Sequence, residues 1–205
     1  MDTALDSAAK GVVRAGLREG AAALDALLAN DEALSAIVAA GALLATALRA
    51  GARVYSCGNG GSMCDAMHFA EELSGRFRDD RPGYAALAIS DPSHLTCVGN
   101  DYGYERVFAR FVEAHGRAGD VLLAISTSGT SRNVVAAVEA SKIRGLKVIV
   151  LTGRPDTPLA RAADVAVVTP GGRYADRVQE LHIKVIHLLI ELVERELAPE
   201  NYRIS

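Results

Sequence analysis

The sequence predicts a three-layer α/β/α sandwich: a doubly wound, mostly parallel five-stranded sheet between helices, preceded by an N-terminal helical pair. Residues 4–51 are rich in alanine and leucine, lack proline and break at Asn30-Asp31, which is typical of two successive helices. From residue 53 onward, short apolar runs alternate with helical stretches, the pattern of parallel strands covered by helices. The expected strands are 53–57, 85–89, 121–125, 147–151 and 164–168.

The length of 205 residues and the apolar fraction of 50% predict a single domain. It divides into helices over 1–51, an α/β core over 52–198 and a tail over 199–205, expected to fray or to lie on a neighbouring chain. The last helix, expected over 174–197, is apolar on nearly every face, and such a helix must be buried on every face. A homo-oligomer is therefore expected, the alternative being a central helix within one monomer.

Charge and composition exclude several classes of function. A net charge of −3 without a run of Lys or Arg argues against a nucleic-acid partner. The acidic N-terminus is unlike a secretory signal, and the apolar runs fall short of the ~20 residues that span a bilayer. We therefore expect a cytoplasmic protein without a membrane partner. Cys57, Cys64 and Cys97 lack metal-site spacing and are expected to be reduced thiols in the core.

A glycine-rich loop, Gly58-Asn59-Gly60-Gly61, follows the first expected strand and precedes a helical pattern. Glycines let backbone N–H groups approach an anionic or polyhydroxylic ligand, and the start of a helix favours negative charge. An ordinary turn between a strand and a helix explains this loop equally well.

A hydroxyl-rich loop, Ser126-Thr127-Ser128-Gly129-Thr130-Ser131, lies between the strand at 121–125 and a helix expected from about 132 to 144. Hydroxyls and free N–H groups at a helix N-terminus suit a phosphate monoester, although the loop is not a P-loop. The alternative is that Ser131 only caps the helix. Both loops follow strands of a parallel sheet, so both are expected at its carboxyl edge, where such sheets bind ligands.

Titratable side chains follow the glycine loop and recur in the last helix. His68 and Glu72 are four residues apart, hence on one helix face and about 6 Å apart along the axis. They can share a metal ion or a substrate; a helix-surface hydrogen bond, or a pair between Glu72 and Arg76, would also explain them. Asp65 lies on the same face, and Cys64 is expected to be a buried thiol facing the sheet.

In the last helix, Asp176, Gln179, His182 and His187 interrupt an apolar surface. His182 is expected to be a hydrogen-bonded interface histidine, since it lies on a different face from His187.

Together these residues resemble the sugar isomerase (SIS) family and, within it, the phosphoheptose isomerases, over residues 30–197. The resemblance is carried by 57–62, 65–73, Arg81-Pro82-Gly83, 99–103, Gly119-Asp120, 126–129 and 174–187. It implies interconversion of sedoheptulose 7-phosphate and D-glycero-D-manno-heptose 7-phosphate in heptose biosynthesis. It also implies a homotetramer with active sites at subunit interfaces and one zinc ion per site. The resemblance also implies a role for each matching residue. The sugar chain would be bound by Asn59, Gly60 and Gly61, its hydroxyls by Asn100 and Asp101, and the phosphate by Ser126, Thr127, Ser128 and Ser131. A zinc and catalytic cluster would consist of His68, Glu72, Gln179 and His187.

Ketose–aldose isomerisation through an enediol requires a base at carbon and a proton donor at oxygen. Glu72 is the expected base and His187 the expected acid, while Asp176 and Gln179 are expected to contact the substrate. Zinc can polarise the carbonyl, and His, carboxylate and amide oxygen are suitable ligands for it.

Geometry constrains the expected zinc ligands. Gln179 and His187 are separated by about 12 Å of helical rise, whereas each metal bond is only ~2 Å long. We therefore expect that at least one of them comes from a different subunit than the His68/Glu72 helix, or that the helix is irregular at Gln179. Alternative functions are a non-catalytic adaptor of the same fold that binds a replication initiator, and an isomerase of another phosphosugar. A phosphosugar-sensing regulator would carry a DNA-binding module, for which residues 1–51 lack the charge.

Overall fold

A five-stranded parallel sheet forms the centre of the computed structural model, which describes residues 3–172 and 174–203. The strand order is β2-β1-β3-β4-β5, and every neighbouring pair is parallel. Each strand begins and ends within about two residues of its prediction from periodicity. The strands are β1 (Val54–Gly58), β2 (Ala86–Ala88), β3 (Val121–Ile125), β4 (Lys147–Thr152) and β5 (Val165–Val168).

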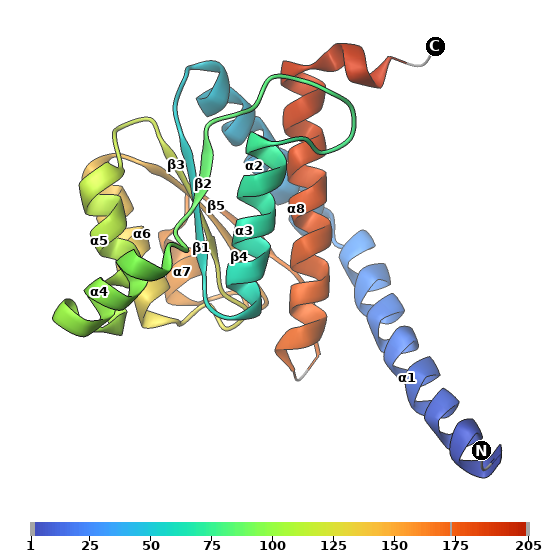
Figure 1. The fold of residues 1–205 in the computed structure, drawn as a ribbon. Coiled ribbons are helices and arrows are strands. Elements are labelled where there is room, and N and C mark those ends of the chain that lie inside the picture. Colours follow the sequence, from blue (N-terminus) through green and yellow to red (C-terminus); the bar gives the residue numbers. More distant parts are fainter. Residues whose placement is uncertain (1–2, 173, 204–205) are drawn as a thin grey trace.

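Helices cover both faces of the sheet, which confirms the predicted three-layer sandwich (Figure 1). One layer contains α2 (Asp31–Arg49), α3 (Gly61–Ser74) and α8 (Ala175–Leu197). The other contains α4 (Pro92–Tyr102), α5 (Val107–His115), α6 (Arg132–Arg144) and α7 (Pro158–Ala162). Two 3₁₀ turns, η1 (Tyr104–Arg106) and η2 (Pro199–Tyr202), complete the body, and α1 (Thr3–Leu28) extends away from it.

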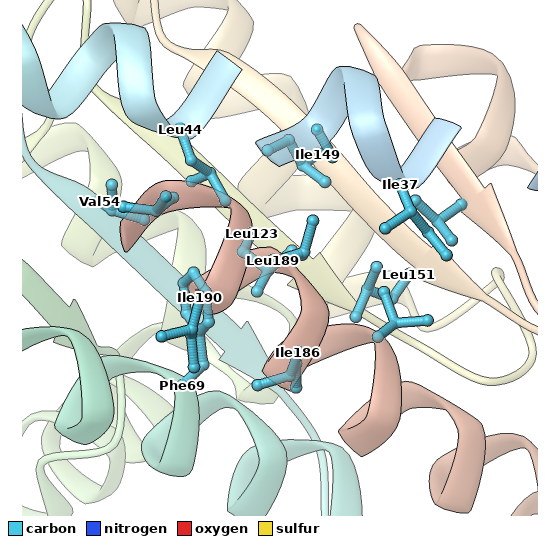
Figure 2. Packing of buried hydrophobic residues seen from close by; sticks show 14 of the residues in the cluster. Ile37, Leu44, Val54, Phe69, Leu123, Ile149, Leu151, Ile186, Leu189 and Ile190 are labelled. Carbon is cyan, nitrogen blue, oxygen red and sulfur yellow. The ribbon is translucent and has the colours of Figure 1, made fainter. Parts of the chain in front are cut away.

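The strands are apolar on both sides because both sides are covered. Side chains alternate across a strand, so Val54 and Leu123 enter the core beneath α2, α3 and α8, whereas Tyr55 and Leu122 enter the core on the α4–α7 side. Figure 2 shows the first core, where Phe69 and the α8 residue Ile190 meet the strand side chains.

The last helix is not buried all round within one chain, so the alternative of a central helix enclosed within one monomer is not what the structure contains. Ile186 and Leu189 are inaccessible to solvent, but Leu188 is 44% exposed. The exposed side chain lies beside an apolar groove between α2 and α8, lined also by Ile37 and Val38.

One described helix, α2, is long and apolar enough to cross a membrane by length and composition alone. The expectation that all apolar runs are too short was therefore wrong for this helix. Asn30 caps it, accepting a hydrogen bond from the Ala33 amide, and its buried side chains include Ile37 and Leu44. These side chains pack with α8 in the main core.

Residues 199–202 differ from the expected frayed or neighbour-bound tail. They form η2 and dock on their own chain: the Tyr202 hydroxyl donates to Glu194, and the Asn201 amide donates to the Asp80 carbonyl. The expectation for the cysteines was correct only for Cys57, because Cys64 and Cys97 are exposed at the surfaces of α3 and α4.

Candidate active site

The glycine loop and the hydroxyl loop meet at the carboxyl edge of the sheet, as predicted. They follow β1 and β3, which are neighbours in register, with Gly58 opposite Ile125. The helices that follow the two loops, α3 and α6, lie in opposite layers. The two loops therefore frame one region of the edge from both faces of the sheet.

Close packing of backbone explains why glycine stands in the first loop. A Cβ on Gly58 would lie 2.6 Å from the Ser62 carbonyl oxygen, so only glycine lets α3 begin this close to the end of β1. Gly60 has φ 54° and ψ −123°, a conformation that L side chains disfavour. This turn sets the direction of α3, and with it the placement of His68 and Glu72.

The Asn59 side chain is engaged within the protein. Its Nδ2 donates to Asn133 Oδ1 at 2.9 Å, and its Oδ1 accepts from Asn133 Nδ2 at 2.8 Å and from the Tyr104 hydroxyl at 2.9 Å. This reciprocal amide pair ties the glycine loop to α6. The side chain predicted to hold the sugar thus has a structural use, which leaves the loop backbone for a ligand.

The hydroxyls of the second loop contact mainly one another. Ser126 Oγ lies 3.0 Å from Ser131 Oγ and 3.4 Å from Ser128 Oγ, and the Thr130 hydroxyl donates to Ser128. Ser131 occupies the N-cap position of α6, yet within the described chain its hydroxyl makes no capping bond. The alternative of a simple cap is therefore not what the structure contains, and the hydroxyl cluster remains available to an anion.

A cavity of 360 Å³ opens beside the hydroxyl loop. Thr127 and Ser128 line it together with Arg154, Tyr174 and Val178. Arg154 is exposed, and among the described residues its guanidinium has no ion-pair partner. The cavity therefore combines hydroxyls with a free positive charge.

Three of the four predicted metal ligands meet between α3 and α8. His68 Nε2 lies 3.1 Å from His187 Nε2 and 3.2 Å from Glu72 Oε2, and His187 Nε2 lies 3.7 Å from the same oxygen. Ligand atoms at zinc bond lengths around a tetrahedral ion lie about 3.3 Å apart. The three atoms thus have the chemistry and the mutual spacing that a zinc ion requires.

The surroundings of this cluster are half open. The His68 and His187 side chains are 41% and 43% exposed, whereas Glu72 is 15% exposed. Glu72 Oε2 is buried without a hydrogen bond among the described residues, and it faces the histidines and not Arg76. A turn before His68, burial raises the pKa of Asp65 to about 6.

Gln179 lies away from this cluster. Its amide covers Gly61 at the start of α3, where an added Cβ would lie 2.8 Å from Nε2. Gly61 precedes His68 by about 10 Å of helical rise. Since α8 is helical from Ala175 onward, the alternative of an irregular helix at Gln179 is not found.

The remaining predicted residues lie apart from the cluster. Asp176 is exposed and accepts a hydrogen bond from the Arg177 amide. Asn100 and Asp101 are exposed at the end of α4, in the opposite layer, where the Asn100 amide donates to Asp101. His182 is fully buried within its own chain, contrary to its expected place at an interface; burial lowers its pKa to about 4, and the Thr152 backbone opposes this shift only in part.

Sequence reasoning missed Asn133, Tyr104 and Arg154. Asn133 could have been found from the sequence, because it is a polar residue in the first turn of the helix that follows the hydroxyl loop. The contact of Tyr104 with Asn59 joins segments 45 residues apart, and periodicity carries no information about such a contact.

The fold and the paired loops define a member of the SIS domain family, whose model matches residues 18–153. The chain belongs to this family and, within it, to the phosphoheptose isomerases. It is 56% identical to the phosphoheptose isomerase of Pectobacterium atrosepticum, covering 92% of this chain and 98% of the relative. It is 60% identical to that of Tolumonas auensis, over 86% and 92%. The solved structure of the phosphoheptose isomerase GmhA from Neisseria gonorrhoeae has a TM-score of 0.78 and 39% identity, over 93% and 98%.

Proposed function

We propose that this chain catalyses the isomerisation of sedoheptulose 7-phosphate to D-glycero-D-manno-heptose 7-phosphate, as a cytoplasmic enzyme of heptose biosynthesis. The observation that carries the proposal is the cluster of His68, Glu72 and His187 beside a sheet edge with a hydroxyl loop. Relatives that are 55–60% identical to this chain, and that match it over nearly their whole length, are named phosphoheptose isomerase. The substrate class also agrees with the hydroxyls and the Arg154 charge around the 360 Å³ cavity.

The reaction needs two proton transfers at neighbouring carbons. Glu72 removes a proton from C1 of the ketose while His187 protonates O2, which gives the enediol. Return of a proton to C2, with loss of the O1 proton, forms the aldehyde at C1. Glu72 Oε2 and His187 Nε2 lie 3.7 Å apart, which places the proposed base and the proposed acid beside one substrate position.

Isomerase activity is tested by incubating the purified chain with sedoheptulose 7-phosphate, with and without zinc, and detecting the aldoheptose phosphate. Glu72→Gln and His187→Gln should each lower kcat by about 10²–10⁴-fold, the usual contribution of an acid or a base. Glu71→Gln, an exposed neighbour on α3, should keep wild-type kcat. Near wild-type turnover in both cluster variants would refute the assignment. A wild-type chain that is inactive on this sugar would indicate another phosphosugar or, if it binds a replication initiator, the adaptor.

We also propose that His68, Glu72 and His187 hold one zinc ion. Zinc would supply Lewis-acid polarisation of the substrate carbonyl. The spacing of the three ligand atoms and the unsatisfied Glu72 oxygen support this assignment. Metal analysis after dialysis against zinc should find one ion per chain, and His68→Ala should lose it.

Gln179, as a fourth ligand, would have to come from a neighbouring subunit, because in its own chain it covers Gly61. Co-expression of a Glu72→Gln chain with a Gln179→Ala chain tests this geometry. If the ligands come from different subunits, mixed oligomers contain some intact sites and regain activity. If they come from one chain, no site is intact and the mixture stays inactive.

The proposed homotetramer is supported by exposed apolar side chains on α1. Val12, Val13, Leu17 and Leu28 are more than half exposed, and a groove of 620 Å³ runs between α1 and α8. Such a stripe is typical of a surface covered by another copy. Leu17→Glu should shift the sedimentation coefficient to that of a smaller species, while Arg14→Glu, on the same helix, should leave the assembly unchanged.

A further inference from the structure

A buried ion pair ties the C-terminal end of α3 to α8. Arg81 Nε donates to Glu194 Oε1 at 2.8 Å, and both side chains are 0% exposed. The second oxygen of Glu194 accepts from the Tyr202 hydroxyl at 2.7 Å. Both carboxylate oxygens of Glu194 are therefore bonded, one of them by the docked C-terminal turn η2.

The same guanidinium closes the end of α3. Arg81 Nη2 donates to the Glu72 carbonyl at 2.6 Å, and Nη1 donates to the carbonyls of Leu73 at 2.8 Å and Gly75 at 3.1 Å. The last carbonyls of a helix lack partners within the helix, and a cation there also interacts favourably with the helix dipole. One side chain thus binds the backbone of Glu72 directly.

The helix at the other end of the ion pair carries the opposing member of the cluster. Glu194 follows His187 by seven residues, which is about two helical turns and the same face of α8. Arg81 therefore joins the backbone that carries Glu72 to the helix that carries His187.

Net stability alone is a weak explanation for this arrangement. Removing two charges from water costs about as much as their attraction returns, and apolar replacements of such pairs are often neutral. A fully bonded guanidinium instead allows one relative placement of α3 and α8, because its planar fork must meet all its acceptors together.

We propose that Arg81 is a positioning residue that sets the distance between Glu72 and His187, and hence the geometry of the acid–base pair and of its metal site. The inference rests on the proposed isomerase function. Partners that orient metal ligands in this way typically change metal affinity or activity by about 10–100-fold.

The test compares Arg81→Lys with Arg78→Lys. Lysine keeps the charge at position 81 but cannot bind Glu194 and the α3 carbonyls together. Arg78 is the matched control, since it lies on the same loop and pairs with Glu191 on α8, but is 53% exposed. Arg81→Lys should lower kcat by about 10–100-fold with KM nearly unchanged, and should weaken zinc binding by a similar factor in chelator competition. Arg78→Lys should leave both quantities at wild-type values.

A second variant separates positioning from folding. Arg81→Met combined with Glu194→Leu leaves no unpaired buried charge, so the double variant should be destabilised less than Arg81→Met alone, which thermal unfolding measures. We expect kcat and zinc affinity to stay low because the α3 carbonyls lose their donor. A folded double variant with wild-type kcat and zinc affinity would overturn the proposal. Failure of the wild type to isomerise the sugar would refute the proposed function instead, and the zinc affinities would still decide the role of Arg81.

Discussion

The two loops at the carboxyl edge of the sheet begin alike but are used differently. Each follows a buried strand, contains glycine and starts a helix. In the glycine loop, the polar side chain is consumed by the protein: Asn59 makes three hydrogen bonds to Asn133 and Tyr104. In the hydroxyl loop, the side-chain hydroxyls of Ser126 and Ser131 bond only to other hydroxyls of the same loop among the described residues.

The difference indicates what each loop is for. Buried polar groups are almost always satisfied, so a side chain that is fully paired within the protein is a structural part, whereas a self-paired hydroxyl cluster can exchange partners for a ligand. This difference supports the proposal that the glycine loop aims α3, with His68 and Glu72, at the reacting carbons, and that the hydroxyl loop holds the phosphate.

Gly58→Ala should distort the glycine loop and should have the largest effect of these substitutions on stability and turnover. Its Cβ would lie 2.6 Å from the backbone of Ser62, so α3 must shift. We expect a loss of about 1–3 kcal/mol of unfolding free energy, the range for overpacking. A misplacement of about 1 Å also lowers kcat by about 10²-fold. Urea unfolding and steady-state kinetics measure the two effects.

Gly11→Ala is the control for this substitution, since an added Cβ there meets nothing within 4 Å in the described chain. Retention of wild-type kcat by Gly58→Ala would show that the glycine loop does not aim α3.

Ser131→Ala tests the hydroxyl loop and should act on binding. A hydrogen bond to a charged group contributes about 1.5–3 kcal/mol, so KM should rise about 10–100-fold while kcat changes little. Inhibition by inorganic phosphate should weaken by the same factor. Ser93→Ala, an exposed serine in the first turn of α4, should change neither value. A fall in kcat at constant KM would place the phosphate elsewhere.

The sequence predicted the strands and the His68/Glu72 face because both follow from local periodicity. It also predicted that the two loops lie at one edge of the sheet, since parallel strands place their carboxyl ends together. It could not give the partner of Asn59 or the Arg81–Glu194 pair, whose members are 74 and 113 residues apart. Such pairings arise from the packing of whole elements. The charge on Arg81 even argued against its burial, because an isolated arginine is almost never fully buried.

Asn133→Ala tests whether the glycine loop has a structural role, and it should affect turnover less than Gly58→Ala does. It removes two of the three hydrogen bonds of Asn59 and leaves that amide poorly satisfied, so unfolding free energy should fall by about 1–3 kcal/mol. We expect a loss of several-fold in kcat, with phosphate inhibition unchanged. Tyr104→Phe removes only one bond and should show the same pattern more weakly. Weaker phosphate binding in Asn133→Ala would mean that the glycine loop also holds the phosphate.

His182→Leu should have the smallest effect on turnover, because His182 lies on α8 outside both loops. Its pKa is lowered by burial to about 4, below the ordinary value of 6.5. As the pH falls, His182 is therefore protonated in the unfolded chain before it is protonated in the folded protein. The wild type should lose up to about 3 kcal/mol of unfolding free energy between pH 6.5 and pH 4. Asp65, with its raised pKa of about 6, acts in the opposite direction in this window and is present in both proteins. The difference between the two unfolding curves thus isolates His182, and it should grow only below pH 6.5. A difference in stability that does not depend on pH would mean that His182 is not held neutral in the folded protein. If His182→Leu changed kcat at pH 7, the active site would extend beyond the two loops and the cluster.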